Sequence, residues 1–306
     1  MIDLERPPRR PAAWHGVLRQ LDCPLGDEPW TGVWRRAAAQ IADGRGDAVA
    51  FLEEHLGLDA GAAPWAARST IVLEVHAAWA GALPTITAPA RADFERLVQS
   101  QAALRGGRRP RVPPTLGALL VTGLGRRRSA DASDRSSDAA RAADERLVLL
   151  SEGPYAGVLP PGRDPEPWRR TSWSLRLEHE AAHALFRRVF GRTPRRLLDE
   201  VLADWVALLR VEGAYDPDLA KQLLGVEAEA PDGGRLEVYL GAFRAAPARR
   251  DALGLDAGRL PSPAVAARAC RRAIDCLAGL PPPGDEAALA RRFCELSLKR
   301  LETFAV

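Results

Sequence analysis

The sequence has few of the features that mark nucleic-acid-binding or membrane-spanning proteins. Lys221 and Lys299 are the only lysines among 306 residues, and the charges nearly cancel, which leaves a formal net charge of +3. Binding to nucleic acid usually requires a larger excess of basic residues. No apolar run approaches the roughly 20 residues of a membrane-spanning helix. We therefore expect a protein that binds neither nucleic acid nor a membrane.

The N-terminal segment also lacks the apolar core of a signal peptide, so a cytoplasmic location is expected. Only four cysteines are present, and no two of them form a C-x-x-C pair. We predict reduced, mostly buried thiols without a metal or catalytic role. These are Cys23, Cys270, Cys276 and Cys294.

With 46% hydrophobic residues, the chain is long enough to bury a large core. Apolar residues at every third or fourth position predict helices over 28–44, 47–57, 63–81 and 87–107. The polar segment 126–145 predicts a mobile loop, and the short apolar run 146–151 predicts a strand at the edge of a sheet.

These patterns predict a mainly helical α+β fold with a small sheet. The predicted regions are a helical N-terminal region (1–125), the loop (126–145), a core (146–212) and a helical C-terminal region (213–306).

Two of the five histidines form a pattern with a chemical meaning. In "HEAAH", His179 and His183 lie about 40° apart on one face of a helix, so both imidazoles can reach one ion. An apolar stripe includes both of them, so we expect the pair to face inward. Glu180 lies about 60° beyond His183, where it can contact a water on the metal and act as a base.

A zinc site with an open water position needs a third protein ligand, and the following helix offers Glu200. Asp204, one turn further on, is placed to accept the second ring N–H of His179. A longer pattern with a third histidine is excluded, because His183 is the last histidine in the chain. The residues therefore predict one Zn²⁺ per chain.

The segments "HEAAH" and "DEVLAD" resemble the gluzincin, or thermolysin-like, zinc metallopeptidases over roughly 171–210. This segment also resembles an uncharacterised bacterial family with H-E-x-x-H, a Phe-Gly helix end and L-D-E-x-x-A-D. The resemblance implies a zincin-like core with His179, His183 and Glu200 as ligands. It also implies Glu180 as the general base and Asp204 as the residue that orients a ligand histidine.

Other residues near this motif are weaker candidates. Tyr155, Arg187 and Trp173 are possible contacts for substrate or transition state, and Tyr155 packing in a turn is the alternative. We expect the first helix to begin at Thr171 or Ser172 and to end at Gly191. Thr193 and Pro194 are expected to open the second helix.

The expected function is zinc-dependent hydrolysis of a peptide or small amide substrate, with Glu180 as the base. One alternative is a metal enzyme, with zinc or iron as the metal, that acts on an amino-acid-derived small molecule. Another is a non-catalytic regulatory protein with a structural metal. The sequence leaves the substrate and the oligomeric state open.

Overall fold

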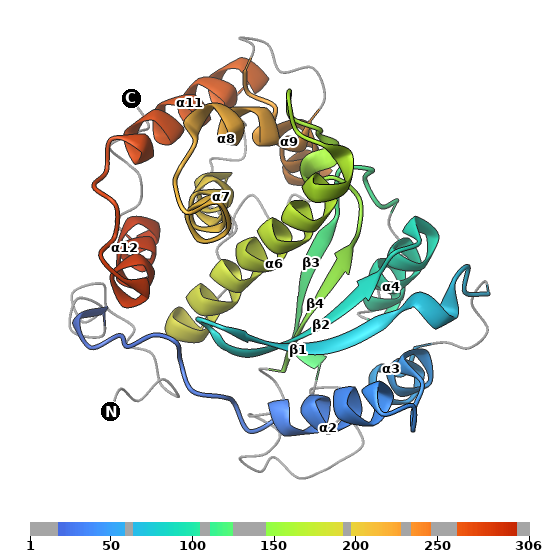
Figure 1. Cartoon of the computed structure of the whole chain (residues 1–306). Helices are drawn as coiled ribbons and strands as arrows, with labels where there is room; N and C mark the ends of the chain where they lie inside the picture. The colour runs from blue at the N-terminus through green and yellow to red at the C-terminus, as the bar shows by residue number, and fades with distance from the viewer. Residues whose placement is uncertain are drawn as a thin grey trace. The chain divides into compact units, whose positions relative to one another are not determined.

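The computed structural model describes residues 18–58, 64–104, 111–124, 145–191, 197–227, 234–245 and 262–298. The chain divides into two compact units, which are described separately below. Unit 1 comprises the chain up to Pro24 and from Pro154 onward, and unit 2 comprises Leu25–Gly153. Helices predominate, and the described strands form a small mixed sheet, so the protein has the predicted mainly helical α+β fold (Figure 1).

Unit 2 is built on a four-stranded sheet with the order β1-β2-β4-β3. Strands β1 (Val72–Ala78) and β2 (Gly81–Ala88) form a tight antiparallel hairpin. Strand β2 runs parallel to β4 (Arg146–Ser151), which pairs antiparallel with β3 (Ala118–Thr122). Every residue of β2 and β4 is buried, as expected for strands covered on both faces.

The helices of unit 2 pack on this sheet. Helix α2 (Thr31–Ala42) contacts β1 and β2, and α4 (Arg91–Leu104) contacts β2 and β4. Helix α3 (Ala48–Leu56) packs on α2. It begins where the Asp47 carboxylate accepts a hydrogen bond from the Ala50 N–H, and it ends at Gly57 with a φ of 61°.

Two predictions for unit 2 are wrong. The segment 63–81 was expected to be helical but contains β1, so the N-terminal region is not helical throughout. Its residues 71–75 include Ile71, Val72 and Val75, whose β-branched side chains favour a strand once a neighbouring strand is present. The strand 146–151 lies between β2 and β3 and not at the edge of the sheet.

The predicted loop 126–145 lies outside the described residues except for Glu145, which is buried. Its carboxylate accepts a hydrogen bond from the indole N–H of Trp34 at 2.7 Å and lies 2.9 Å from Nε2 of His55. The end of the polar segment is thus part of the packed interior of unit 2.

Unit 1 contains the two helices with the sequence motif. Helices α6 (Pro165–Phe190) and α7 (Leu197–Glu212) pack closely against each other. Helix α7 also contacts α8 (Pro217–Leu224), α11 (Pro263–Ala278) and α12 (Glu286–Leu298). Helix α9 (Arg235–Ala245) packs on α8 and α11. The centre of unit 1 is therefore α7, with helices around it (Figure 1).

The chain passes from one unit to the other between Pro24 and Leu25 and again between Gly153 and Pro154. Both points differ from the boundaries of the predicted regions, which stay predictions. All four cysteines are free; Cys270 and Cys294 are buried, Cys23 is half-buried and Cys276 is exposed. Within the described ranges, we find no helix whose length and apolar character would let it cross a membrane.

Candidate metal centre

Helix α6 carries both histidines of the motif and begins earlier than the sequence predicts. The expected starts at Thr171 and Ser172 are wrong, because Asp164 in an extended conformation is followed by Pro165 at the first helical position. Proline suits this position, since its missing N–H would have no partner inside the helix. The helix ends at Gly191 with a φ of 68°, which confirms the predicted end.

Both histidines point into the interior of unit 1. The residues His179 and His183 are 4% and 6% exposed. The apolar residues expected on the same stripe are also buried, namely Leu175, Ala182, Phe186, Val189 and Phe190. The prediction that the pair faces inward is therefore confirmed.

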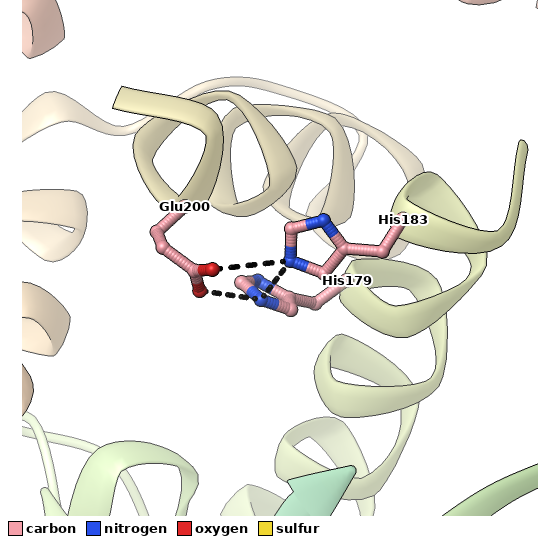
Figure 2. Close-up of side chains that lie close together, drawn as sticks. All are labelled: His179, His183 and Glu200. Carbon is pink, nitrogen blue, oxygen red and sulfur yellow. Dashed lines mark hydrogen bonds and ion pairs between the residues drawn. The ribbon is translucent and has the colours of Figure 1, made fainter. Parts of the chain in front are cut away.

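Helix α7 brings Glu200 to the two histidines (Figure 2). The Nε2 atoms of His179 and His183 are 3.1 Å apart. Oε2 of Glu200 lies 3.2 Å from Nε2 of His179, and Oε1 lies 3.5 Å from Nε2 of His183. One ligand-type atom from each of the three side chains falls within 4.8 Å of the other two. The structure thus brings together the three residues that the sequence predicts as metal ligands.

The spacing of these atoms suits a zinc ion. With bonds of about 2.0–2.1 Å and tetrahedral angles, two ligand atoms of zinc lie about 3.3 Å apart. The closest separations are 3.1, 3.2 and 3.5 Å, the last two to different oxygens of Glu200, and they lie near this value. Two imidazoles and a carboxylate are also a donor set that zinc accepts. Glu200 is the most accessible of the three, since its side chain is 19% exposed.

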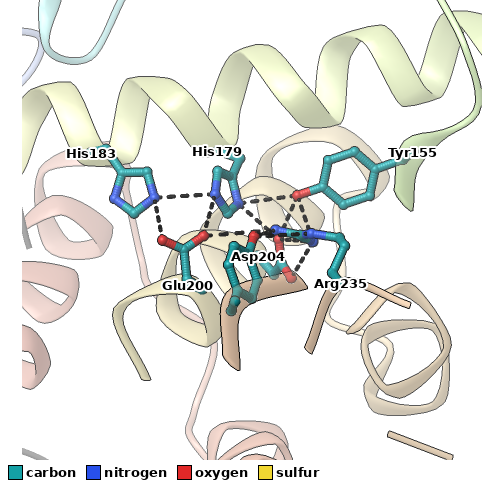
Figure 3. A network of polar contacts seen from close by, with 7 residues as sticks. Tyr155, His179, His183, Glu200, Asp204 and Arg235 are labelled. Carbon is teal, nitrogen blue, oxygen red and sulfur yellow. Dashed lines mark hydrogen bonds and ion pairs between the residues drawn. The ribbon is translucent and has the colours of Figure 1, made fainter. Parts of the chain in front are cut away.

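Asp204 lies behind His179, as the sequence predicts (Figure 3). Nδ1 of His179 is 2.8 Å from Oδ1 of Asp204, so this nitrogen donates its hydrogen to the carboxylate. When the ring is neutral, as metal binding requires, its proton lies on Nδ1 and Nε2 directs a lone pair at His183 and Glu200. The structure therefore orients His179 as a ligand would be oriented.

Tyr155 packs in a short turn, as the alternative predicts, and also belongs to the same network. It opens the short 3₁₀ helix η3 (Tyr155–Gly157), and its backbone N–H donates to Oγ of Ser172 at 2.9 Å. Its buried hydroxyl donates to Oδ1 of Asp204 at 2.5 Å and lies 3.1 Å from Nδ1 of His179. This arrangement gives Tyr155 a role in holding Asp204, and its role as a substrate contact stays a prediction.

Two further residues of the network were missed by the sequence analysis. Arg235 on α9 donates from Nη1 to both oxygens of Asp204, at 2.8 and 3.0 Å, and to the Tyr155 hydroxyl at 3.1 Å. Its Nε and Nη2 donate to the hydroxyl of Tyr239, at 3.1 and 2.6 Å. No spacing signal in the sequence connects α9 with the motif.

The protonation of the cluster follows from its charges. Burial lowers the pKa of His179, but its hydrogen bonds with Asp204 and Glu200 raise the pKa to about 9. Burial likewise raises the pKa of Asp204, but Arg235 and His179 outweigh this effect and hold it below its usual value. When His179 loses its proton to make room for a metal, the carboxylates of Glu200 and Asp204 exceed the single charge of Arg235 by one, and a cation would offset this excess.

The remaining candidates lie on α6. Glu180 is 8% exposed and follows His179 directly, at the helical position where the sequence places the base. Arg187 and Trp173 are half-buried, and their roles as substrate contacts stay predictions. Thr193 and Pro194, expected at the start of the second helix, lie outside the described residues.

Comparison with known proteins gives one match. Residues 139–254 match the model of a "Family of unknown function (DUF7005)". Neither a curated protein nor a solved structure matches the chain significantly. The matched segment covers less than half of the chain but contains every residue of the network from Tyr155 to Tyr239. Over this segment, the chain is similar to a family whose function is not known.

Proposed function

We propose that this protein is a zinc-dependent hydrolase that cleaves a peptide or amide bond. The observation that carries the proposal is the convergence of His179, His183 and Glu200 with ligand-type atoms 3.1–3.5 Å apart. Structural zinc sites usually have four protein ligands, whereas catalytic sites have three and keep a position for water. Among the described residues the group has three members, which favours a catalytic site.

Each residue has a role in this proposal. His179, His183 and Glu200 hold the ion, and Asp204 fixes the ring of His179. Zinc would lower the pKa of a bound water and polarise a substrate carbonyl. Glu180 accepts a proton from the attacking water and passes it to the leaving amine.

The resemblance of "HEAAH" and "DEVLAD" to gluzincin metallopeptidases supports a peptide or amide substrate. Those enzymes use a histidine beyond the second ligand helix, and no histidine follows His183 here. The histidine that stabilises the transition state in those enzymes therefore has no counterpart in this chain. The cytoplasmic location stays a prediction, as does the absence of nucleic-acid and membrane partners.

The same donor set also suits ferrous iron, because two histidines and one carboxylate form the facial triad of non-haem iron enzymes. Such an enzyme would act on an amino-acid-derived small molecule. Activity that is kept with zinc and lost with ferrous iron under air removes this alternative.

The experiment that tests the proposal is a peptide-library cleavage screen with the purified protein. We expect cleavage that a chelator abolishes and added zinc restores. Glu180→Gln keeps the size of the side chain but removes the basic oxygen, so it should retain zinc and lose at least about 10²-fold in turnover.

Glu178→Gln is the matched control, because Glu178 lies on the same helix but accepts a hydrogen bond from Nε of Arg210. It should turn over like the wild type. A Glu180→Gln protein with wild-type turnover would rule out the mechanism. If the protein is instead a regulatory protein with a structural metal, Glu180→Gln should leave every cellular phenotype unchanged, and His183→Ala should abolish function.

A further inference from the structure

Helix α9 supplies a pair of side chains that contact both carboxylates of the candidate centre. Arg235 and Tyr239 lie four residues apart, on one face of α9. Arg235 is 7% exposed, and its guanidinium lies over the rings of Tyr155 and Tyr239, at 4.8 and 5.4 Å from their centroids. An arginine held between two rings and several acceptors has little freedom to change its rotamer.

The first contact of α9 is with Asp204. A single guanidinium nitrogen, Nη1 of Arg235, donates to both carboxylate oxygens. Oδ1, one of these two atoms, also accepts from His179 and Tyr155. Because a carboxylate with several fixed donors cannot rotate freely, Arg235 determines where Oδ1 meets the His179 ring.

The second contact is with Glu200. The hydroxyl of Tyr239 accepts hydrogen bonds from Nε and Nη2 of Arg235, which leaves its own hydrogen free to donate. Burial raises the pKa of Tyr239 well above its usual value, and a hydrogen bond with the Glu200 carboxylate is among the causes that add to this. Nη2 of Arg235 itself lies 3.9 Å from Oε2 of Glu200. The carboxylate that faces both histidines is therefore also held from α9.

The start of α9 is fixed by a close backbone contact. Gly234 has a φ of 86°, and a Cβ atom built on it would lie 3.1 Å from Cα of Gly225 at the end of α8. A Cβ atom at this position would require Gly225 to move by a few tenths of an ångström, and a φ of 86° is strained for any residue other than glycine. Glycine therefore lets α9 begin where Arg235 reaches Asp204.

We propose that α9, through Arg235 and Tyr239, is the element that positions Asp204 and Glu200 for metal binding and so sets the metal affinity of the site. This inference rests on the proposed metal site. Neither residue is one of the three candidate ligands; Arg235 acts through Asp204, and Tyr239 acts through Glu200. The sequence motif on α6 and α7 is then incomplete without a third helix.

The test measures zinc affinity by competition with a chromophoric chelator on metal-free protein. Removing a group that orients a metal ligand typically weakens binding by about 10–100-fold, and we expect this loss for Arg235→Gln. Tyr239→Phe, which removes one oxygen atom, should weaken binding by about 10-fold. Arg235→Lys should recover part of the loss, because it restores the charge without the fork of donors.

Tyr215→Phe and Arg291→Gln are the matched controls and should bind zinc like the wild type. Within the described residues, the Tyr215 hydroxyl is buried without a hydrogen-bond partner, and Arg291 donates to the backbone carbonyl of Leu21. A purely structural role of Arg235 predicts a different result. In that case Arg235→Gln would lower the unfolding temperature by the same amount in zinc and in chelator. The increase in unfolding temperature that zinc causes would then equal that of the wild type.

The outcomes separate the two proposals. A wild-type protein that binds no zinc contradicts the metal site itself. A wild type that binds zinc, with Arg235→Gln and Tyr239→Phe binding equally tightly, overturns the role of α9 and leaves the metal site standing. If Arg235→Gln fails to fold, the smaller change Tyr239→Phe decides the question.

Discussion

Replacing Asp204 by alanine removes the acceptor on which three buried donors converge. Asp204 is 4% exposed and accepts hydrogen bonds from His179, Tyr155 and Arg235. Breaking a buried ion pair from one side typically costs about 3–5 kcal/mol, because the other charge stays buried without compensation. Domains have total stabilities of only about 5–15 kcal/mol. From the sequence alone, we would expect Asp204→Ala to affect metal retention more than folding, but Arg235 makes folding sensitive as well.

A compensating change separates the two effects. Asp204→Ala combined with Arg235→Met removes both charges and should recover part of the free energy of unfolding, as removing a whole buried pair often does. Zinc affinity should stay about 10–100-fold below that of the wild type, because Nδ1 of His179 still lacks its acceptor. Urea unfolding in chelator measures the first quantity, and zinc competition measures the second.

The result that refutes this reasoning is additivity. If the free-energy changes of Asp204→Ala and Arg235→Met add to within about 0.5 kcal/mol in the double variant, the two residues are not coupled. Full recovery of zinc affinity in the double variant would equally contradict the orienting role of Asp204.

Two further predictions concern pH and the backbone of α9. Burial lowers the pKa of His179, but its hydrogen bonds to two carboxylates raise it from 6.5 to about 9 without metal. Zinc must displace this proton, so zinc affinity should rise about tenfold per pH unit between pH 6.5 and about 9. Competition titrations that show the same zinc affinity across this range would contradict the prediction. Protonated His179 should stabilise the metal-free fold below pH 6.5, and this stability should be lost as the pH rises through about 9, as measured by urea midpoints in chelator. Gly234→Ala should lower both the urea unfolding midpoint and the zinc affinity, because its Cβ would lie 3.1 Å from Cα of Gly225. Gly241→Ala should lower neither, because the space around Gly241 is open. Equal behaviour of the two variants would show that the start of α9 is not constrained.

The sequence predicts the part of the site that depends on helix periodicity. Residues four apart on a helix share a face in any tertiary arrangement, so the pairing of His179 with His183 and of Glu200 with Asp204 follows from spacing. The inward orientation also follows, because the apolar stripe includes the histidines.

Other parts depend on tertiary contacts that no local pattern records. Arg235 lies 31 residues from Asp204, and an arginine and a tyrosine four apart on a short helix look like an ordinary solvent-facing pair. Strand β1 was missed because the apolar residues of 71–75 fit a helical period until β2 is there to pair with them. The contact of Arg235 with Asp204 and the pairing of β1 with β2 both depend on the position of a second segment in space, which the sequence does not reveal.

The measurement that tests the central claim most directly is the zinc content of the purified protein, determined by elemental analysis without chelator. The account predicts about one zinc per chain in the wild type and in Glu180→Gln, and none in His183→Ala, with all three proteins folded by circular dichroism. A folded wild-type protein that contains no metal and takes up no added zinc would contradict the metal centre formed by His179, His183 and Glu200.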